Sequence, residues 1–392
     1  MNLTVVDLGG RPDLPLLVLG PSLGTSVRTL WAETAARLAA DFRVVGWELP
    51  GHGAGAPAGD LAELTIADLA AAVVAAVDAL PRLDDAKAFH YAGVSVAGAV
   101  GLQLLLDAPA RVASATLLCT GAQIGSAATW AERIEQVRSA GTTTLVGASA
   151  QRWFGPGFRE RRPDVADALL ADLAVADDAG YAAVCAALGS FDVRHRLAEV
   201  ATPVLVVAGA EDPVTTPAVA AAIVDGVQQG ERVVLDGVAH LAPAEAPDAV
   251  AALVRRHARA ADRDARTVAE VRQDGMGIRR AVLGEAHVDR AIANTDSFTA
   301  DFQQFITEYA WGGVWTRGVL DRRARSMITL TALVARGHLD ELAMHVRAAR
   351  TNGLTTEEIG EVILHSAVYC GVPDANAAFR VAQQTLAAMD DA

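Results

Sequence analysis

The sequence is poor in cysteine and in positive charge, and it has no long uncharged hydrophobic run. Its three cysteines, Cys119, Cys185 and Cys370, are odd in number and far apart, so they provide neither a disulfide framework nor a CxxC redox or zinc pair. No apolar stretch approaches the roughly 18 residues that a membrane-spanning helix needs, and the N-terminal residues lack the basic region of a signal peptide. We therefore expect a cytoplasmic protein without a membrane partner.

Acidic residues outnumber basic ones by 47 to 33, which gives a formal net charge of −14. Such an excess, spread along the chain, repels phosphate backbones and anionic lipid headgroups, so nucleic acid is not an expected partner. At 392 residues the chain is too long for one compact core, while its hydrophobic content of 52% is ample for two. The composition therefore predicts a globular protein of two domains.

Strand-like and helical segments alternate over residues 1–260. Such alternation is typical of a mostly parallel sheet with helices on both faces. The strand signal stops over about residues 125–196, where helical pieces such as TWAERIEQVR and RWFGPGF indicate a helical cap. The predicted strands are PLLVLG, FRVVGWEL, AFHYAGV, ATLLCT, PVLVVAG and RVVLDG. We predict an α/β domain that carries this cap.

The remainder of the chain has a different pattern. A short, polar and charge-dense stretch over residues 261–274 suits an interdomain linker. Beyond it, residues 275–392 show helical periodicity without alternation of period two, and Thr355 with Glu358 matches a capping box. The expected fold class is therefore α/β followed by an all-α domain.

Two serines compete for the role of nucleophile. A nucleophile elbow needs small residues two places before and after the serine, because the chain turns sharply from a strand into a helix. GPSLG at 20–24 is the literal match around Ser22, whereas GVSVA at 93–97 surrounds Ser95 and ends in Ala97. We favour Ser95, because a strand precedes it and the helix-like AGAVGLQLLLDAP follows. The loop around Ser22 is where the second backbone N–H of an oxyanion hole belongs.

Asp212 and His240 are the predicted partners of Ser95. A serine hydroxyl is a weak nucleophile until a histidine takes its proton and an acid orients that histidine. Asp212 follows the strand PVLVVAG and His240 follows the next strand, so all three stand at strand ends. Glu211 is the alternative acid, and we expect it to face solvent. His52, in the glycine turn WELPGHGAG, precedes the serine, so a structural role is predicted for it.

These segments resemble the α/β-hydrolase superfamily over residues 1–258, and more narrowly the 3-oxoadipate enol-lactonases. The narrower resemblance rests on GPSLGTS, WELPGHGAG, GVSVAG, RWFGPGF and GAEDPVTTP. It implies that the backbone N–H groups of Leu23 and Val96 form the oxyanion hole while the serine opens an enol-lactone ring. Such a substrate carries a carboxylate, which needs a local cation in so acidic a protein. Arg133 and Arg152 in the cap are the candidates.

Polar residues recur at helical spacing near the C-terminus. Glu341 and His345 are four residues apart, and so are Glu361, His365 and Tyr369, so each set shares one face of a helix. Solvated ion pairs would also explain such spacing. The apolar neighbours in LDELAMHV and EVILHSAVY predict partial burial of both histidines.

The segment from about 275 to 390 resembles the 4-carboxymuconolactone decarboxylases. The resemblance rests on the stretches GEAHVDRAIANTDSFTADFQQFITEYAWGGVWTRG, LDRRARS and DELAMHVRAARTNGLTTEEIGEVILHSAVYCGVPDANAAF. That family is similar in fold to alkylhydroperoxidase-type helical proteins, whose peroxidases use a CxxC pair ahead of a histidine. Here the two cysteine positions before His345 hold His338 and Glu341, so disulfide peroxidase chemistry is not available.

This second resemblance implies a decarboxylation that needs no cofactor, since the electrons left by CO₂ delocalise through the ring double bond onto the lactone oxygen. The enzyme must bind carboxylates and deliver a proton to carbon. We predict that His345 transfers the proton and that Glu341 orients it or sets its pKa. Arg322 and Arg325, three residues apart, are predicted to bind carboxylate. Further candidates are Arg317, His365 and Tyr369.

A di-iron site built from these histidines and glutamates is not favoured. Such sites use Glu-x-x-His at i,i+3, whereas the spacing here is i,i+4. We expect no metal and no other cofactor.

The two resemblances fit one another, because the decarboxylase would make the enol-lactone that the hydrolase consumes. The predicted function is that of a bifunctional enzyme of protocatechuate degradation through the β-ketoadipate pathway, with 3-oxoadipate as the final product. The alternative is a broader serine esterase or lactonase whose helical domain serves only in assembly. From the second resemblance we expect a homo-oligomer formed through the helical domain.

Overall fold

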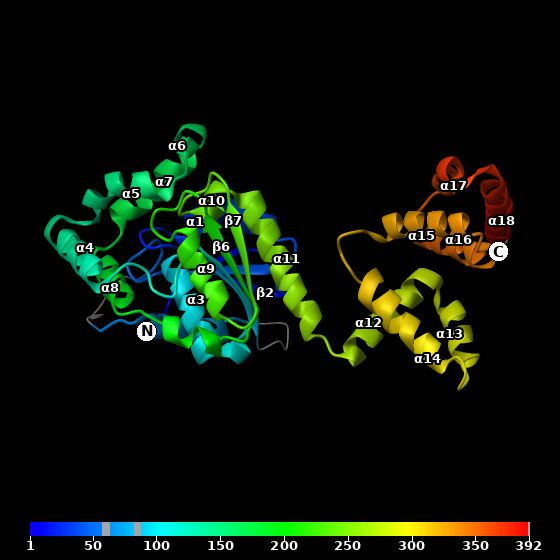
Figure 1. Cartoon of the computed structure of the whole chain (residues 1–392), viewed down its shortest axis with the longest axis horizontal. Coiled ribbons are helices and arrows are strands. Elements are labelled where there is room, and N and C mark those ends of the chain that lie inside the picture. Colours follow the sequence, from blue (N-terminus) through cyan, green and yellow to red (C-terminus); the bar gives the residue numbers. More distant parts are fainter. Residues whose placement is uncertain (57–62, 82–87, 391–392) are drawn as a thin grey trace. The chain divides into compact units, whose positions relative to one another are not determined.

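The computed structural model describes residues 1–56, 63–81 and 88–390 of the chain. It contains two compact units, Met1–Asp264 and Ala265–Ala392 (Figure 1). Each unit has a hydrophobic core of its own. Within the described ranges, no helix is both long enough and apolar enough to cross a lipid bilayer.

The stretch between the two units is largely helical. Helix α11 (Pro247–Ala265) ends inside the predicted linker, and α12 (Val268–Leu283) begins inside it. The side chain of Thr267 accepts a hydrogen bond from the N–H of Glu270, and the Glu270 carboxylate accepts one from the N–H of Thr267 at 2.7 Å. The polar residues that suggested a linker therefore belong to helix ends, where side chains satisfy free backbone groups.

Seven strands form the sheet of the first unit, in the order β1-β3-β2-β4-β5-β6-β7. All neighbours are parallel except β1, which is antiparallel to β3. Three of the central strands, β2, β4 and β6, are buried throughout, which explains their continuous apolar runs. The strands are β1 (Val5–Gly9), β2 (Leu16–Gly20), β3 (Arg43–Trp47), β4 (Phe89–Val94), β5 (Val112–Leu118), β6 (Val204–Gly209) and β7 (Gly230–Leu235).

Strand β1 is the one that the sequence analysis did not predict. It lies at the edge of the sheet, and Val6 is its single buried residue. An edge strand with one buried side chain produces neither a continuous apolar run nor a clear alternation, so its pattern carries little signal.

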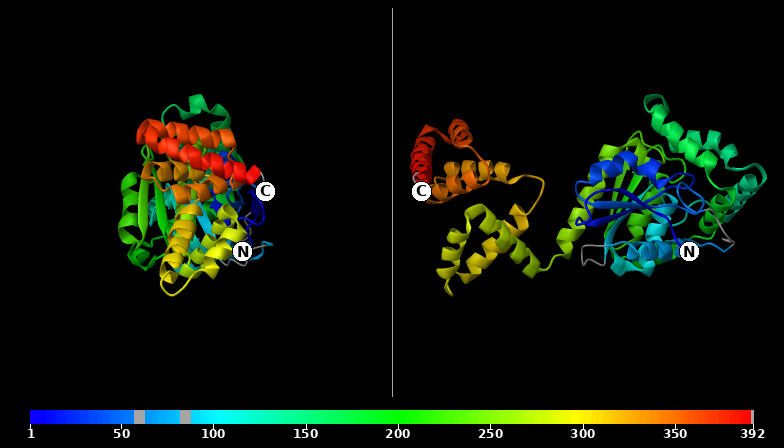
Figure 2. Two further views of the ribbon diagram at one scale, coloured as in Figure 1. Left: turned by 90° about the vertical axis from the view of Figure 1, so that its right-hand side faces the viewer. Right: turned by 180° about the vertical axis from the view of Figure 1, so that it is seen from behind.

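Helices cover both faces of this sheet (Figures 1 and 2). Helix α1 (Val27–Leu38) lies on one face, and α3 (Val96–Asp107) and α9 (Pro217–Gly226) lie on the other. Helix α3 approaches the sheet closely because it contains glycine: a Cβ added at Gly101 would lie 2.6 Å from Cδ2 of Leu117. The first unit also contains α2 (Ile66–Asp78), η1 (Pro109–Arg111) and α10 (Ala242–Glu245).

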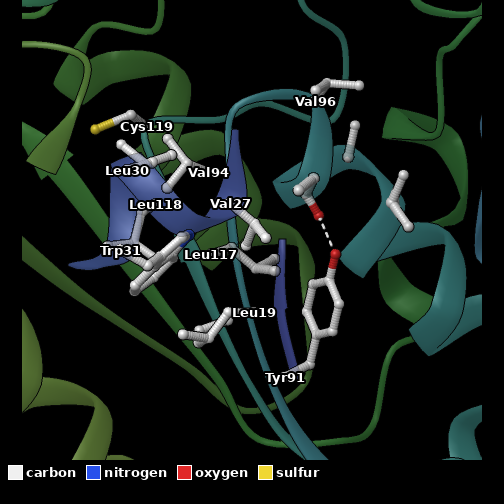
Figure 3. Packing of buried hydrophobic residues seen from close by; sticks show 14 of the residues in the cluster. Leu19, Val27, Leu30, Trp31, Tyr91, Val94, Val96, Leu117, Leu118 and Cys119 are labelled. Atoms are coloured by element: carbon white, nitrogen blue, oxygen red, sulfur yellow. Dashed lines mark hydrogen bonds between the residues drawn. The ribbon is translucent and has the colours of Figure 1, made fainter. Parts of the chain in front are cut away.

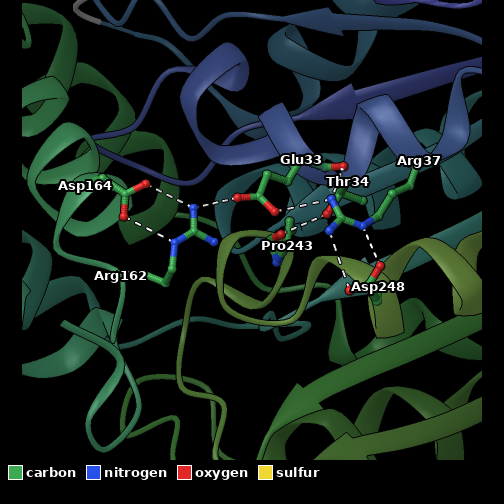
Figure 4. A network of polar contacts seen from close by, with 7 residues as sticks. All are labelled: Glu33, Thr34, Arg37, Arg162, Asp164, Pro243 and Asp248. Atoms are coloured by element: carbon green, nitrogen blue, oxygen red, sulfur yellow. Dashed lines mark hydrogen bonds and ion pairs between the residues drawn. The ribbon is translucent and has the colours of Figure 1, made fainter. Parts of the chain in front are cut away.

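The cap is inserted between β5 and β6, and polar contacts attach it to α1 (Figure 4). It consists of α4 (Ala127–Ala140), η2 (Thr142–Leu145), α5 (Val146–Trp153), α6 (Phe158–Arg161), α7 (Pro163–Val175), α8 (Asp178–Gly189) and η3 (Arg194–Glu199). Arg162, between α6 and α7, donates a hydrogen bond to Oε1 of Glu33 on α1 at 2.6 Å. One residue further, Thr34 donates to the carbonyl of Pro243 at 2.8 Å. Helix α1 thus supports both the cap and helix α10, which follows β7.

The second unit is all helical apart from its turns. Its main core is shared by the last four helices and includes Leu330, Leu342, Val346, Ile359 and Ile363. The predicted capping box of Thr355 and Glu358 is present at the start of α17. The helices after α12 are α13 (Glu285–Ala293), α14 (Ala300–Phe305), the π-helix η4 (Ile306–Trp315), α15 (Arg322–Arg336), α16 (Leu339–Thr351), α17 (Thr356–Cys370) and α18 (Val372–Asp390).

Within the region of helical periodicity, α14 passes directly into the π-helix η4 over the stretch FTADFQQFITEYAW. It packs closely against α12, because a Cβ added at Gly275 would lie 2.3 Å from the Thr307 carbonyl oxygen and 2.7 Å from the Gly312 nitrogen. A smaller core of Val282, Trp311 and Ala348 joins α12, η4 and α16. Since π-helical turns often occur at functional sites, this junction is a place to look for one.

Candidate active sites

Ser95 stands at a strained turn between β4 and α3. Its φ and ψ are 55° and −113°, and among the described residues Cys119 is the one other non-glycine residue with a positive φ. The Ser95 N–H donates to the Leu118 carbonyl at 2.9 Å, and the Ser95 carbonyl accepts from Oγ1 of Thr120 at 2.7 Å. The end of β5 therefore holds the turn, and a strained serine in this place has the geometry of a nucleophile elbow.

The elbow accommodates Ala97 at the position where the motif has its second glycine. A Cβ added at Gly93 would lie 2.4 Å from the Ala97 carbonyl oxygen, so a larger residue does not fit there. A Cβ added at Gly20 would lie 2.5 Å from Cβ of Ala97, which means that β2 provides the space for the alanine methyl. The Tyr91 hydroxyl donates to the Ala97 carbonyl at 2.8 Å (Figure 3). The departure from G-x-S-x-G therefore leaves the turn intact.

His240 and Asp212 lie within hydrogen-bonding distance of each other. Nδ1 of His240 is 2.8 Å from Oδ2 of Asp212, and both side chains are buried. Asp212 also accepts hydrogen bonds from the Val214 N–H at 2.8 Å and from Oγ1 of Thr215 at 2.7 Å. Burial alone would raise the pKa of Asp212, but the attraction of His240 and these hydrogen bonds hold it below its usual value. A carboxylate so placed orients the ring and leaves Nε2 for a nucleophile.

All three predicted residues follow the carboxyl ends of parallel strands, and so they reach the same edge of the sheet. Ser95 follows β4, Asp212 follows β6 and His240 follows β7. In the sheet these strands lie in the order β4-β5-β6-β7. Glu211, the alternative acid, is exposed as expected. The catalytic roles of the three residues remain predictions.

The backbone N–H groups of Leu23 and Val96 are the predicted oxyanion hole. Leu23 lies in the turn after β2, Val96 is the first residue of α3, and both residues are buried. Within the described part of the chain, neither N–H donates a hydrogen bond. The neighbouring Ser22 belongs to the turn itself, since its N–H donates to Oγ1 of Thr25 at 3.1 Å. Free N–H donors beside a helix N-terminus suit a developing oxyanion.

Arg133 of α4 and Arg152 of α5 are half-buried in the cap. Nη1 of Arg133 lies 3.5 Å from the hydroxyl of Tyr181 on α8, to which it donates a hydrogen bond. Burial and then the positive charge of Arg133 lower the pKa of Arg152, so the two cations are close. Neither arginine is ion-paired with a carboxylate of the described residues. Two adjacent, half-buried cations without an acid partner favour the binding of an anion.

His52 packs against Tyr181, the residue that contacts Arg133. Its ring stacks on Tyr181 with centroids 5.9 Å apart, and its Nδ1 lies 2.9 Å from the Pro50 carbonyl oxygen. Burial lowers the pKa of His52 to about 4, which keeps the ring neutral near pH 7. These contacts are those of a packed, neutral ring, in keeping with the structural role predicted for it.

Glu245 is a partly buried carboxyl group that the sequence analysis did not single out. Its Oε2 accepts from the Gly155 N–H at 2.6 Å, and its Oε1 accepts from the N–H groups of Ala239 at 3.0 Å and Leu241 at 3.3 Å. Burial outweighs these hydrogen bonds and raises the pKa of Glu245 to about 7. Through these hydrogen bonds, Glu245 connects the cap with the loop that bears His240. Its place five residues after His240 was the signal available in the sequence.

His345 on α16 is half-buried beside two titratable groups. Burial and the nearby His287 lower the pKa of His345, while the charge of Glu341 opposes them. Glu341 is exposed one turn earlier on the same helix, and His287 comes from α13. The stretch GEAHVDR contributed to the resemblance, but the sequence analysis gave His287 no role. Among the described residues, no group of three or more His, Cys, Asp or Glu side chains is placed to hold a metal ion.

The two predicted carboxylate-binding arginines lie at the start of α15. Nε of Arg325 donates to the Leu320 carbonyl at 3.2 Å, and its Nη2 donates to the Arg317 carbonyl at 2.6 Å. Arg322 and Arg317 are exposed. Arg325 therefore supports the turn before α15, and a role of these arginines in binding carboxylate remains a prediction.

The predicted partial burial of His365 is wrong. His365 and Tyr369 are both exposed, with ring centroids 5.3 Å apart. The apolar neighbours that suggested burial, Leu364 and Val368, are themselves 55% and 77% exposed, because no other described residues cover this face of α17. His365 and Glu361 line an apolar groove of about 630 Å³ between α15 and α17.

Comparison with known proteins accounts for both units. The family model of the α/β-hydrolase fold matches residues 15–247, and that of the carboxymuconolactone decarboxylase family matches residues 300–384. The 3-oxoadipate enol-lactonase 2 of Acinetobacter baylyi is 35% identical over 241 residues, which cover 61% of this chain and 87% of that protein. A crystal structure of the enol-lactonase from Burkholderia xenovorans aligns with a TM-score of 0.61 and 29% identity over 65% of this chain and 95% of that one.

The 4-carboxymuconolactone decarboxylase of Acinetobacter baylyi is 46% identical over 112 residues, which cover 29% of this chain and 84% of that protein. These matches confirm the predicted fold class and both resemblances. The chain belongs, in its first unit, to the enol-lactonase family of α/β-hydrolases and, in its second, to the carboxymuconolactone decarboxylase family.

Proposed function

We propose that the chain is a bifunctional enzyme that carries out two consecutive steps of the β-ketoadipate pathway. Its helical unit decarboxylates 4-carboxymuconolactone to 3-oxoadipate enol-lactone, and its α/β-hydrolase unit hydrolyses that lactone to 3-oxoadipate. The observation that supports this most strongly is that one chain joins members of two families whose named reactions are consecutive. Joining the two units in one chain raises the local concentration of the second site for a labile intermediate, which favours capture.

In the hydrolase unit, Ser95 is the proposed nucleophile. Its Oγ attacks the lactone carbonyl while Nε2 of His240 takes the hydroxyl proton, and the N–H groups of Leu23 and Val96 stabilise the oxyanion. The ring C–O bond then breaks, His240 returns the proton to the enol oxygen, and the enol rearranges to the ketone. Water activated by His240 cleaves the acyl-enzyme and releases the acid and the free serine. Asp212 holds the ring of His240 throughout, as its 2.8 Å contact with Nδ1 allows.

Arg133 and Arg152 are proposed to bind the carboxylate that the lactone carries. Both arginines are half-buried, and no carboxylate in the described part of the chain is ion-paired with them, which leaves both charges available to a ligand. Tyr181 orients Arg133 through the 3.5 Å contact between its hydroxyl and Nη1. Since the cap carries all three residues, it would provide substrate selection while the sheet edge provides the chemistry.

In the helical unit, His345 is the proposed proton donor. The bond from the ring carbon to its carboxylate breaks, and CO₂ leaves. The electron pair spreads through the ring double bond onto the carbonyl oxygen of the lactone. A proton from His345 then reaches the carbon next to the lactone carbonyl, which gives the enol-lactone and neutral His345. Glu341, whose charge raises the pKa of His345, would favour reprotonation of the ring.

A single experiment tests both halves of the proposal. Purified Ser95→Ala protein is given 4-carboxymuconolactone formed in place from carboxymuconate, and the products are separated by chromatography. We expect the enol-lactone to accumulate. Unchanged starting lactone from folded protein would refute the decarboxylase assignment. Formation of 3-oxoadipate faster than the spontaneous rate would mean that Ser95 is not the nucleophile, and Ser22 would be tested next.

We also propose that the helical unit assembles copies of the chain. Three apolar or aromatic residues near the junction of α17 and α18 are 73% to 77% exposed, namely Val368, Tyr369 and Val372, and they continue the apolar face beside the groove. Large exposed apolar patches mark association sites. Sedimentation velocity should give an oligomer for the natural chain and a smaller species for Val368→Asp. A monomer at micromolar concentration in both would refute assembly.

A further inference from the structure

Arg279 on α12 is a buried cation that has no acidic partner among the residues the structure describes. Arg279 is 5% exposed, and its guanidinium donates two hydrogen bonds, both to neutral oxygen atoms. Nη1 donates to Oγ1 of Thr307 at 3.2 Å, and Nη2 donates to Oε1 of Gln303 at 2.9 Å. Its Nε has no hydrogen-bond partner among the described residues. Burying an arginine in this way is costly unless an anion binds to it.

The surroundings of Arg279 connect it to the proposed decarboxylase site. Val282, one turn further along α12, shares a small core with Trp311 of η4 and Ala348 of α16. Ala348 in turn lies three residues after His345 on the same helix. Besides burial, the positive charge of Arg279 lowers the pKa of His287, and His287 lowers the pKa of His345, so the three groups are linked electrostatically. Thr307, which accepts from Arg279, belongs to the π-helix η4.

This cluster is strongly electropositive. Burial is the largest cause that lowers the pKa of His287. The positive charges of Arg290, Arg279 and Arg347 lower it further. Glu341, whose charge raises the pKa of His345, is exposed in the first turn of α16. His287 and His345 are half-buried, so the cluster extends from buried Arg279 toward solvent. Its composition is that of a site for a small anion rather than for a cation or a neutral ligand.

We infer that Arg279, assisted by His287, binds the carboxylate arm that the lactone substrate keeps, and so places the other carboxylate for loss as CO₂ beside His345. This inference rests on the proposed decarboxylase function. An arginine on the departing carboxylate would stabilise the starting state more than the transition state and would slow the reaction, whereas one on the retained arm anchors both states equally. It also gives the carboxylate-binding role to Arg279 in place of Arg322 and Arg325.

Chemically, the retained arm takes no part in bond breaking. The bond between the ring carbon and the second carboxylate breaks, CO₂ departs, and the electron pair moves onto the lactone oxygen through the ring. The proton that completes the reaction comes from His345, so the atoms and charges balance without another reactant. Arg279 is therefore a substrate-binding residue, and its loss should act mainly on KM.

The test uses the full chain with Ser95→Ala, so that no lactone ring is opened. The probe is muconolactone, a butenolide that carries the acetate arm but lacks the carboxylate that would leave. Its affinity is measured by calorimetry and by inhibition of 4-carboxymuconolactone decarboxylation. We expect Arg279→Gln to weaken muconolactone binding by about 10- to 100-fold, as for the loss of a charged hydrogen-bonded pair. Arg279→Lys should keep part of the affinity, and Arg380→Gln, at an exposed position on α18, should change nothing.

Three results would overturn the inference. The first is folded Arg279→Gln protein that binds muconolactone as tightly as the parent does. A loss of affinity for 4-carboxymuconolactone alone would mean that Arg279 holds the departing carboxylate. If Arg279→Gln does not fold, the protein with Arg279 unchanged is tested with muconolactone and with its neutral methyl ester. Equal binding of the two would refute a carboxylate site. Absence of turnover by the natural chain would refute the decarboxylase proposal instead, while calorimetry would still test the anion site.

Discussion

Glu245 holds the backbone on both sides of His240, because its Oε1 accepts hydrogen bonds from the N–H groups of Ala239 and Leu241. The other oxygen, Oε2, accepts from Gly155 of the cap at 2.6 Å. One carboxyl group therefore connects the loop that presents His240 with the cap segment between α5 and α6. Glu245 is a positioning residue for His240, and a catalytic role for it is not required.

The first prediction is that Glu245→Ala lowers kcat for enol-lactone hydrolysis by about 10- to 100-fold with little change in KM. Removing the carboxyl leaves the N–H groups of Gly155 and Ala239 unpaired, while Leu241 keeps only its contact with the Trp153 carbonyl at 3.3 Å. The His240 loop can then shift, and displacements of about 1 Å cost catalysis on this scale. Decarboxylation by the same protein should be unchanged. Glu211→Gln is the matched control, since Glu211 is exposed beside Asp212. A purely structural role would lower thermal stability and leave kcat of the folded fraction unaltered.

The second prediction concerns pH and the stability of the hydrolase unit. Burial raises the pKa of Glu245 to about 7 in the folded chain, above its ordinary value of 4.5. Between these values the folded state binds a proton that the unfolded state has lost, so the contribution of Glu245 to stability is complete below pH 4.5 and is lost as the pH rises through about 7. Denaturant unfolding across this range should show a downward slope that Glu245→Gln reduces. An unchanged slope would contradict the raised pKa.

The third prediction is that Asp212→Asn lowers kcat for lactone hydrolysis by about 10⁴-fold, the scale seen when the acid of a serine triad becomes an amide. The amide cannot favour the proton on Nδ1 of His240, so Nε2 no longer serves as base. Decarboxylation should persist at the parent rate in the same preparation, which serves as an internal control for folding. Equal loss of both activities would argue against two independent sites.

The fourth prediction is that Arg133→Gln and Arg152→Gln each raise KM for the enol-lactone by about tenfold or more, because each removes a charge-assisted hydrogen bond to carboxylate. Hydrolysis of a neutral ester such as p-nitrophenyl acetate should be unaffected, since that substrate has no carboxylate. Arg138→Gln is the control, as Arg138 is exposed on the same helix as Arg133. Equal effects on both substrates would mean that the arginines support the cap fold and do not select the anion.

The sequence carried enough information to predict the edge of the sheet where the triad residues lie. Buried strands such as β4 and β6 produce apolar runs. The parallel topology places the residues that follow them, Ser95 one position and Asp212 three positions after the strand end. The elbow was also predictable, because the sequence has a glycine, Gly93, two residues before Ser95. The structure leaves no space for a side chain at that position. The edge strand β1 was missed, since one buried residue leaves no pattern.

Residues whose role depends on three-dimensional neighbours could not be found from the pattern. His365 was expected to be partly buried because its neighbours are apolar, but that face of α17 is exposed. Arg279 appeared as one of many arginines, and its burial follows from the close approach of α12 to η4 at Gly275. Glu245 likewise matters through Gly155, which lies 90 residues earlier in the chain.

The last prediction is that decarboxylation speeds up as the pH falls below 7. His345 must be protonated to act as donor, and burial together with His287 holds its pKa below the ordinary 6.5, so its protonated fraction grows as the pH falls toward that pKa. The measurement is kcat/KM for 4-carboxymuconolactone in the Ser95→Ala protein, from about pH 8 to about pH 5. His345→Gln should lose both the rate and this limb of the profile. Glu341→Gln should move the limb to lower pH, because the charge of Glu341 raises the pKa of His345. A rate that falls with falling pH would mean that His345 acts as a base, and the proton delivered to carbon would then have to come from another group.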